Sequence, residues 1–242
     1  MVYLIGAGPG DPGLITYKGL QILKSCDAVI YDRLGTGELL DLVRSDCTKI
    51  YVGKQAGAHY KKQEEINRIL VETAGKYEKV VRLKGGDSFV FGRGGEEILT
   101  LQEADIPFQV IPGVTSAIAV PEVLGIPVTH REMSRSFHVI TGHTKKGEAD
   151  ALANIHKQEG TSVCLMGLSN LEPIMQRLRE EGNRRRHRLC DFKWYAAWRD
   201  NRARYGRDDR QTCFEERACF TGNHSRRTDS CLHDEGQEAQ CN

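Results

Sequence analysis

The sequence predicts an α/β protein of two domains, with a mostly parallel β-sheet in the N-terminal domain. Short apolar runs rich in Val, Ile and Leu alternate with segments whose apolar residues recur at helical spacing. Such alternation is typical of a doubly wound parallel sheet. Ligands bind such sheets at the carboxyl ends of the strands. The glycine-rich and charged motifs of this chain follow directly after predicted strands, so the fold also predicts where a site would lie.

Residues 1–112 are expected to form the first domain. Its first strand, Val2–Ile5, is closed by Gly6, and Thr16 can cap the helix that follows. Further strands are predicted at Ala28–Tyr31, Ile50–Val52, Lys79–Leu83 and Phe108–Ile111. Further helices are predicted at Glu96–Glu103 and at Glu64–Ala74, where Ile66, Ile69, Leu70 and Thr73 share one face.

A second α/β domain is expected at residues 113–182. Strands are predicted at Phe137–Thr141 and Ser162–Met166, with a helix near Glu148–His156. Residues 183–242 differ in composition, with no Val, no Ile and only two Leu, but five of the eight cysteines. A segment with so few aliphatic residues cannot bury enough apolar surface to offset its ordering entropy. We therefore expect an incomplete second domain followed by an aberrant, disordered tail.

The composition of the whole chain narrows the class of protein. Its 34 Lys and Arg against 33 Asp and Glu give a net charge of +1, which argues against a protein that coats a polyanion. No apolar run approaches the roughly 20 residues of a membrane-spanning helix. The first residues are typical of a buried strand and lack a basic leader. A cytoplasmic protein without membrane contact is therefore expected.

The first motif is the glycine-rich run after the first strand, Gly6-Ala7-Gly8-Pro9-Gly10-Asp11-Pro12-Gly13. Its glycines let the backbone turn tightly and approach a ligand closely. A tight connection without a ligand is the plainer interpretation. A dinucleotide site is another, because Asp32 lies where a ribose-binding acid belongs. The prolines, however, depart from the G-x-G-x-x-G spacing of dinucleotide sites.

Two further motifs follow the fourth and fifth predicted strands. The run from Lys84 to Gly95 places two glycine clusters around a carboxylate and two phenylalanines, which would suit a ribose or adenine pocket. The run from Pro112 to Ala117 offers small side chains and hydroxyl groups where the domains are expected to meet.

In this order the three motifs resemble those of the tetrapyrrole methylases, and most closely those of members that act on uroporphyrinogen III. Shorter segments agree as well: Tyr31–Leu34, Val52–Lys54, Gln63–Asn67, Val128–Arg131 and Thr141–His143. The resemblance extends from Val2 to about Gly182, about three-quarters of the chain. It implies the two-domain fold of that family, an active site in the cleft between the domains, and a homodimer.

The resemblance also implies S-adenosylmethionine as the methyl donor. Its contacts carry over to Pro9, Gly85, Gly86, Asp87, Val90, Thr115, Ser116 and Met166. The proton acceptor of the family aligns with Asp32 and its proton donor with Lys54. Ser88 stands where the family usually has proline, and we expect this change to loosen the loop. No metal ion is expected.

The implied reaction is the C-methylation of uroporphyrinogen III, through precorrin-1 to precorrin-2, on the route to sirohaem and cobalamin. An enzyme of this kind must align the electrophilic methyl group with a ring carbon and exclude water. An acid/base pair can help the ring proton to leave. The many carboxylates of the substrate require cationic donors. Candidates are Arg33, Arg82, Arg93, His130, Arg131, Arg135 and His143.

Other functions remain open at this point. The nearest is methylation of a later corrinoid intermediate. A non-catalytic product with a basic, nucleic-acid-binding tail is a second, suggested by Arg184–Arg186 but weakened by the Asp and Glu residues around it, so no nucleic-acid partner is expected. A dinucleotide oxidoreductase is the most distant alternative.

The tail itself has three interpretations. A zinc module lacks paired ligands at C-x-x-C or H-x-x-x-H spacing. The basic tail is the second interpretation, and a shifted reading frame is the third and the one we favour. Read one nucleotide later, the codons of Phe192–Tyr195 permit Ser-Asn-Gly-Thr, similar to a turn that contacts the cofactor in the family. Those of Phe220–Thr228 permit an apolar strand. We therefore expect a frame break near Gly182 and low or absent activity.

Overall fold

The computed structural model describes residues 1–33, 36–53, 62–132, 134–142 and 160–167, positions 170, 171, 173, 174 and 176, and the backbones of 187–189 and 219–221. Within this part the chain divides into two compact units. The first unit contains residues 1–127. All the residues described above from 128 onward belong to the second unit. No helix in these ranges is long and apolar enough to cross a membrane.

The first unit is built around a parallel sheet of five strands, which confirms the predicted fold class. The strands are β1 (Val2–Gly6), β2 (Ala28–Tyr31), β3 (Thr48–Tyr51), β4 (Val80–Lys84) and β5 (Phe108–Ile111). They lie in the order β3-β2-β4-β1-β5, and each neighbouring pair is parallel. Because β1 and β4 are parallel neighbours, the motifs that follow them lie side by side.

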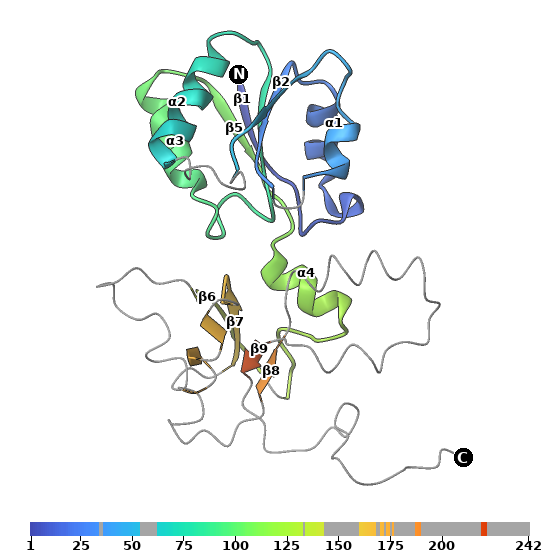
Figure 1. Ribbon diagram of the computed structural model, residues 1–242. Coiled ribbons are helices and arrows are strands. Elements are labelled where there is room, and N and C mark those ends of the chain that lie inside the picture. The colour runs from blue at the N-terminus through green and yellow to red at the C-terminus, as the bar shows by residue number, and fades with distance from the viewer. Residues whose placement is uncertain are drawn as a thin grey trace. The chain divides into compact units, whose positions relative to one another are not determined.

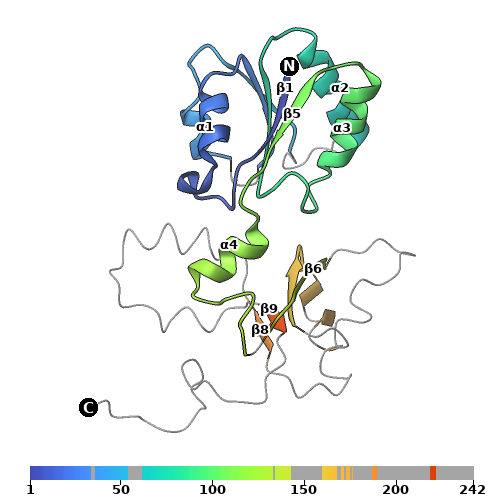
Figure 2. The ribbon, with the colours of Figure 1, turned by 180° about the vertical axis from the view of Figure 1, so that it is seen from behind.

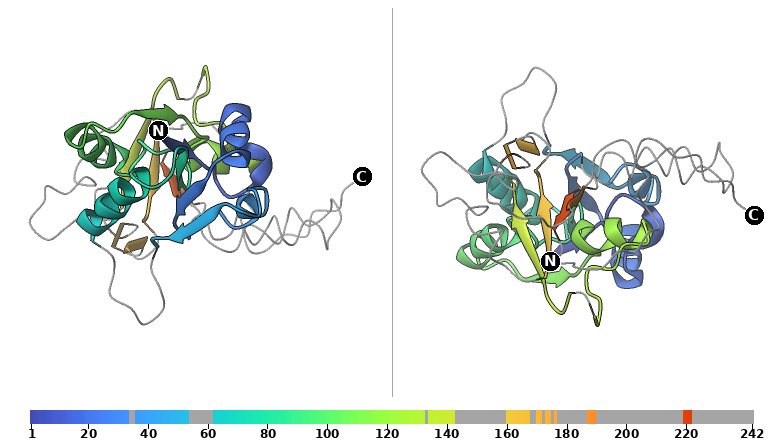
Figure 3. Two further views of the ribbon diagram at one scale, coloured as in Figure 1. Left: turned by 90° about the horizontal axis from the view of Figure 1, so that it is seen from above. Right: turned by 90° about the horizontal axis from the view of Figure 1, so that it is seen from below.

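Helices cover both faces of this sheet. They are α1 (Tyr17–Lys24), α2 (Gln63–Ala74) and α3 (Gly94–Glu103), with short 3₁₀ turns at Pro12–Leu14 and Glu38–Asp41. The helix α1 lies on one face, and α2 and α3 lie on the other (Figures 1 and 3). As predicted, Thr16 caps α1, because its Oγ1 accepts a hydrogen bond from the Gly19 N–H at 3.3 Å.

A fourth helix, α4 (Ser116–Val123), was not expected from the sequence. It is eight residues long and contains Pro121, a residue that usually interrupts a helix interior. Its start is fixed by Thr115, whose Oγ1 accepts a hydrogen bond from the Ala117 N–H at 3.3 Å. Since α4 belongs to the first unit, this unit continues past residue 112.

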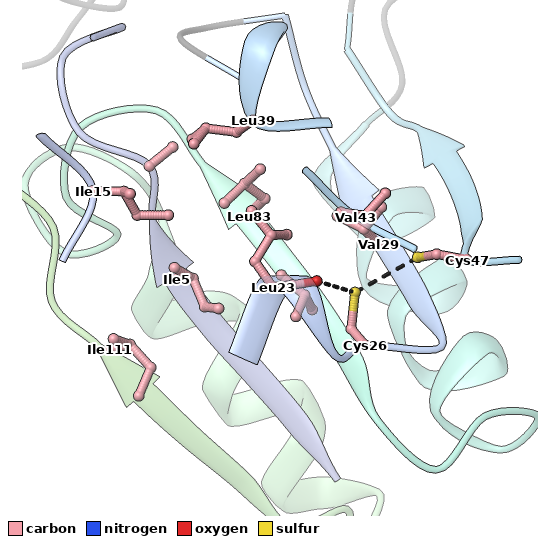
Figure 4. Packing of buried hydrophobic residues seen from close by; sticks show 12 residues of the cluster. Ile5, Ile15, Leu23, Cys26, Val29, Leu39, Val43, Cys47, Leu83 and Ile111 are labelled. Carbon is pink, nitrogen blue, oxygen red and sulfur yellow. Dashed lines mark hydrogen bonds between the residues drawn. The ribbon is translucent and has the colours of Figure 1, made fainter. Parts of the chain in front are cut away.

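Two apolar layers hold the sheet between its helices. Successive residues of β1 alternate between them: Val2 and Leu4 belong to the layer that includes Leu101 of α3, and Ile5 belongs to the layer that includes Leu23 of α1. All five are 0% exposed. Burial of each such aliphatic side chain contributes about 1.5–3 kcal/mol to stability. The layer under α1 is drawn in Figure 4.

Two cysteines lie within the layer under α1. The Sγ atoms of Cys26 and Cys47 are 3.6 Å apart, and the Cys26 thiol also contacts the carbonyl oxygen of Leu23 at 3.2 Å (Figure 4). Both are free thiols. Burial, reinforced by the neighbouring Cys47, raises the pKa of Cys26 from 9.0 to about 12.

This shift predicts a loss of stability at alkaline pH. Below pH 9.0 the Cys26 thiol is protonated in both states, whereas between 9.0 and about 12 only the unfolded chain releases the proton, so stability falls as pH rises. We expect Cys26→Ala to remove this part of the pH dependence. Thermal unfolding midpoints measured at about pH 8 and about pH 10 test it. Equal pH dependence of the two proteins would contradict the assignment.

The second unit contains a sheet in the order β6-β7-β9-β8 (Figures 1 and 2). Its strands are β6 (Phe137–Thr141), β7 (Thr161–Leu165), β8 (His187–Leu189) and β9 (Cys219–Thr221). The predicted strands β6 and β7 are parallel, whereas β9 is antiparallel to both β7 and β8. Residues 183–242, for which the composition predicts disorder, thus contribute two strands of three residues each. The helix expected near Glu148–His156 lies outside the described residues.

Candidate active site

The carboxyl ends of β4 and β1 bring the first two glycine motifs together. The Gly8 N–H donates to the Gly86 carbonyl oxygen at 3.1 Å, and the Gly86 N–H donates back to the Gly8 oxygen at 2.7 Å. The Ala7 N–H donates to the Lys84 oxygen at 2.7 Å, which extends the pairing of the two strands past their ends. The two motifs therefore form one continuous stretch of hydrogen-bonded backbone.

The third motif joins them through glycines that leave no room for a side chain. A Cβ atom added to Gly113 would lie 2.3 Å from the Gly86 oxygen and 2.6 Å from the Gly6 Cα. One added to Gly6 would lie 2.5 Å from the Gly113 Cα. Real Cβ atoms do not approach other atoms so closely, so glycine is required at both positions. We call Gly6, Gly86 and Gly113 the glycine junction.

Asp87 ties the second motif to the third. Its Oδ1 accepts a hydrogen bond from the Phe89 N–H at 2.8 Å, and its Oδ2 accepts one from the Gly113 N–H at 3.0 Å. Hydrogen bonds to an ionised acceptor are stronger than those between neutral groups. Both carboxylate oxygens of Asp87 are thus used to hold the backbone in place. The sequence predicted Asp87 as a cofactor contact but did not reveal this structural role.

We expect Asp87→Asn to lower stability and to weaken cofactor binding. The asparagine amide keeps one oxygen acceptor, but its NH₂ group faces the other backbone N–H, so one hydrogen bond is lost. Losing a hydrogen bond to a charged acceptor lowers the free energy of unfolding by about 1.5–3 kcal/mol. Denaturant unfolding and calorimetric titration with S-adenosylhomocysteine measure the two effects. The exposed Asp41 provides the matched control Asp41→Asn, which should change neither. An Asp87→Asn variant as stable as wild type would contradict the clamp, by which we mean the two hydrogen bonds that Asp87 accepts from the Phe89 and Gly113 N–H groups.

The junction leaves space for a ligand beside Gly86. Gly86 has a φ of +66°. Apart from Gly86 and its two chain neighbours, the only described atom within 4 Å of an added Cβ would be the Ser116 nitrogen, at 3.9 Å. Ser116 is the first residue of α4, and the first N–H groups of a helix favour anionic groups. The open backbone and the helix start fit a ligand that carries a carboxylate, as S-adenosylmethionine does.

Most of the residues expected to contact the cofactor lie at this one edge of the first unit. They are Pro9, Gly85, Gly86, Asp87, Val90, Thr115 and Ser116. Ser88, the departure from the family pattern, is 0% exposed, and its hydroxyl finds no hydrogen-bond partner among the described residues. Its carbonyl oxygen accepts from the Gly94 N–H at 3.0 Å, so the backbone at this position is held although proline is absent.

Two expected site residues are not placed at this edge. Met166 lies in the second unit, directly after β7, and its side chain is 55% exposed. Its φ of +57° is unusual for a residue with a side chain, and such backbone strain is concentrated at functional positions. Lys54, the expected proton donor, lies outside the described residues, as does His143.

Asp32 lies at the same edge of the first unit, directly after β2. Its side chain is 26% exposed, and its Oδ2 is 3.5 Å from Nη2 of Arg82. The Thr36 hydroxyl donates to the Asp32 backbone oxygen at 2.6 Å, which fixes the start of the loop. Asp32 is therefore accessible on one side and faces a buried cation on the other.

A buried ionic cluster lies behind Asp32. Glu97 of α3 is 0% exposed, and its Oε1 accepts hydrogen bonds from Arg82 Nε at 3.0 Å and from Lys84 Nζ at 2.9 Å. Burial lowers the pKa of Lys84 below its ordinary value, and the charge of Arg82 lowers it further, while Glu97 opposes both. We call Asp32, Arg82, Lys84 and Glu97 the charged quartet.

One predicted substrate-binding cation is corrected by this cluster. Arg82 is 3% exposed and is bonded inside the protein, so it is not a surface donor for substrate carboxylates. Arg93 is more open: its Nε donates to Glu96 Oε1 at 2.7 Å, and its side chain is 46% exposed. The other described candidates, Arg33, His130, Arg131 and Arg135, are all exposed.

Comparisons with known proteins agree with these observations. Residues 1–202 match the sequence profile of the family described as "Tetrapyrrole (Corrin/Porphyrin) Methylases". A uroporphyrinogen-III C-methyltransferase of Methanocaldococcus jannaschii is 55% identical over 184 residues, which is 76% of this chain and 76% of that protein. A siroheme synthase of Escherichia fergusonii is 51% identical over 181 residues, or 75% of this chain but only 40% of the synthase.

A solved structure gives the same result. The uroporphyrin-III C-methyl transferase of Thermus thermophilus, in complex with S-adenyl homocysteine, superposes with a TM-score of 0.66 at 42% sequence identity. The match covers 77% of this chain and 78% of that one.

Proposed function

The chain belongs to the tetrapyrrole methylase family, and from this premise we propose that it transfers methyl groups from S-adenosylmethionine to carbon atoms of uroporphyrinogen III, giving precorrin-2 through precorrin-1. One observation carries the proposal. The residues expected to contact the methyl donor in the first unit converge beside the glycine junction, at the same sheet edge as Asp32.

The expected site residues have distinct roles in the proposed reaction. When bound, S-adenosylmethionine supplies an electrophilic methyl group. The Gly85–Gly86 turn and the start of α4 orient the donor with open backbone, so that no side chain blocks its approach. The methylated carbon already carries a side chain, so the proton leaves from another atom of the macrocycle. Asp32 accepts this proton, and Lys54 is the proton donor that the family resemblance implies. Met166, which belongs to the second unit, is a further contact with the donor that the family resemblance implies.

The substrate is recognised through its carboxylates. Arg93 lies in the second motif at the start of α3, and its φ of +59° is a conformation that few residues with side chains adopt. With the exposed Arg33, it offers guanidinium groups suited to carboxylates. Arg131 and Arg135 are also exposed and belong to the second unit.

Methyl transfer to a panel of tetrapyrroles tests the proposed function. The chain is incubated with S-adenosylmethionine carrying a labelled methyl group and with either uroporphyrinogen III or a later precorrin. We expect label in the tetrapyrrole fraction with uroporphyrinogen III only. Preferential labelling of a later precorrin would assign the chain to a later step, and tight binding of NAD in place of S-adenosylhomocysteine would overturn the methyltransferase proposal.

We also propose that the residues after about Gly182 come from a shifted reading frame. The match to the Methanocaldococcus jannaschii enzyme covers 76% of each chain, so the two chains are about equally long and about a quarter of each has no counterpart in the other. A frameshift replaces sequence without necessarily shortening the chain, which supports this interpretation. We expect the tail to lower the rate of methyl transfer without changing the reaction.

The coding DNA tests the frame directly. Read one nucleotide later, it should encode Ser-Asn-Gly-Thr across residues 192–195 and an apolar strand across 220–228. A stop codon or an unrelated sequence in that frame would contradict the proposal. A protein made from the restored frame should methylate faster than the chain as it stands.

Assembly and location complete the proposal. We propose a homodimer, as the family resemblance implies, without nucleic acid, and equilibrium sedimentation of the chain with and without duplex DNA tests both statements. We propose the cytoplasm as its location. The described cysteines Cys26, Cys47 and Cys164 are free thiols, which suits a reducing compartment. Fractionation of cells followed by immunodetection checks it.

A further inference from the structure

The four residues of the charged quartet differ in their exposure to solvent. Three of its members are almost completely buried: Arg82 is 3% exposed, Lys84 5% and Glu97 0%. Asp32 alone reaches solvent, with 26% of its side chain exposed. The quartet therefore connects the interior between β4 and α3 to its one partly exposed carboxylate, that of Asp32.

Arg82 is held rigidly on its buried side. Its Nε donates to Glu97 Oε1 at 3.0 Å, and its Nη1 donates to the backbone oxygens of Leu83 at 3.0 Å and Ile30 at 3.4 Å. These bonds come from three elements, β2, β4 and α3. The remaining nitrogen, Nη2, is directed at Asp32 Oδ2 at 3.5 Å. At this distance the guanidinium acts on Asp32 through its charge more than through a short hydrogen bond.

Glu97 is the anchor of the cluster. Both cations bind its Oε1, and its Oε2 is buried without a hydrogen-bond partner among the described residues. A carboxylate optimised for stability would use both oxygens. Here one oxygen fixes the ends of Arg82 and Lys84, and the second remains unsatisfied.

Stability does not explain such a cluster. Removing charges from water is costly, and replacement of a buried ion pair by apolar side chains of similar size is often neutral or stabilising. Buried charges beside a reactive edge are instead a common feature of functional sites. The two positive and two negative groups balance in charge, so the quartet can persist in the interior.

We propose that Arg82 is a positioning residue, which Glu97 holds in place so that its guanidinium fixes the carboxylate of Asp32 for proton removal from the substrate. The inference rests on the proposed function, in which Asp32 is the proton acceptor. Lys84 balances the charge of Glu97 and has no direct bond to Asp32. Arg82 itself touches neither substrate nor cofactor.

A double-mutant cycle tests the coupling of Arg82 to Asp32. Arg82→Met, Asp32→Asn and the double variant are compared with wild type in the chain as it stands and in the chain with its frame restored after Gly182. We expect Arg82→Met to lower kcat on the order of 10- to 100-fold, with KM for S-adenosylmethionine unchanged. When Asp32→Asn is already present, the same substitution should change kcat by less than about twofold.

Paired substitutions separate this role from folding. Arg82→Met with Glu97→Met, and Lys84→Met with Glu97→Met, each remove one buried ion pair and leave the charge balanced. Both should unfold at temperatures close to wild type or above it. The second pair removes the anchor Glu97 but keeps Arg82 and its bonds to the Ile30 and Leu83 oxygens, so it should lose turnover too, but less than the first. Arg68→Met, which removes an exposed i,i+4 pair with Glu72, is the unaffected control.

The outcomes distinguish the inference from the proposed function. If Asp32→Asn keeps full turnover, the assigned proton acceptor is wrong and the role of Arg82 falls with it. If Asp32→Asn is inactive but Arg82→Met lowers stability alone, only the positioning role is overturned. If neither chain transfers methyl groups, the same cycle is measured by denaturant unfolding: a positive coupling between Arg82 and Asp32 supports the contact, and strict additivity overturns it.

Discussion

Replacement of Gly113 by alanine is expected to abolish cofactor binding and to destabilise the first unit by about 3 kcal/mol. The added Cβ would lie 2.3 Å from the Gly86 oxygen and 2.6 Å from the Gly6 Cα. Both neighbours are backbone atoms, and they are tied to one another through the hydrogen bonds of Gly86 with Gly8, so they cannot move aside without opening the junction. Denaturant unfolding and titration with S-adenosylhomocysteine measure the effect.

The chain offers a matched control for this substitution. An added Cβ at Gly37 meets no described atom within 4 Å, and the backbone there is in the right-handed helical region, with φ −50°. Gly37→Ala should therefore be neutral, or slightly stabilising because alanine restricts the unfolded chain. If Gly113→Ala and Gly37→Ala behave alike, the three motifs are not packed as described.

Replacement of Asp32 by asparagine is expected to lower the rate of methyl transfer about 10²- to 10⁴-fold, the usual contribution of a positioned acid or base. Asparagine has the same shape, so the loop after β2 should keep its structure, and the Thr36 hydroxyl still donates to the backbone oxygen at residue 32. Binding of S-adenosylhomocysteine should be unchanged, because the glycine junction is not altered.

Single-turnover kinetics together with calorimetry check this prediction. Asp46→Asn serves as the control, since Asp46 is an exposed partner of Arg44 with 70% of its side chain accessible. It should leave both measurements unchanged. A variant with asparagine at position 32 that retains the wild-type rate would remove Asp32 from the proposed mechanism.

The sequence predicted the parallel sheet because its strands are short apolar runs buried on both faces. It also predicted the edge at which the motifs meet, since the carboxyl ends of parallel strands lie together. The helix α4 escaped prediction because it is short and contains Pro121. The clamp by Asp87 could not be predicted, because its partner Gly113 is 26 residues away along the chain.

The charged quartet was missed for a different reason. The strand Val80–Lys84 contains an arginine and a lysine among apolar residues, and in a strand covered on both faces each of these needs a buried partner. That requirement was a signal in the sequence. The partner, Glu97, lies on the following helix among other glutamates, and only the folded structure distinguishes it from its exposed neighbour Glu96.

Identification of the tetrapyrrole product tests the central claim most directly. The chain, and its frame-restored counterpart, are incubated with S-adenosylmethionine and uroporphyrinogen III, and the product is examined by mass spectrometry and carbon NMR. We expect a product with two added methyl groups bonded to ring carbons, formed faster by the frame-restored chain, and formed about 10²- to 10⁴-fold more slowly when Asp32 is replaced by asparagine. Unchanged uroporphyrinogen III with both chains, or methyl groups on carboxylate oxygens, would contradict it.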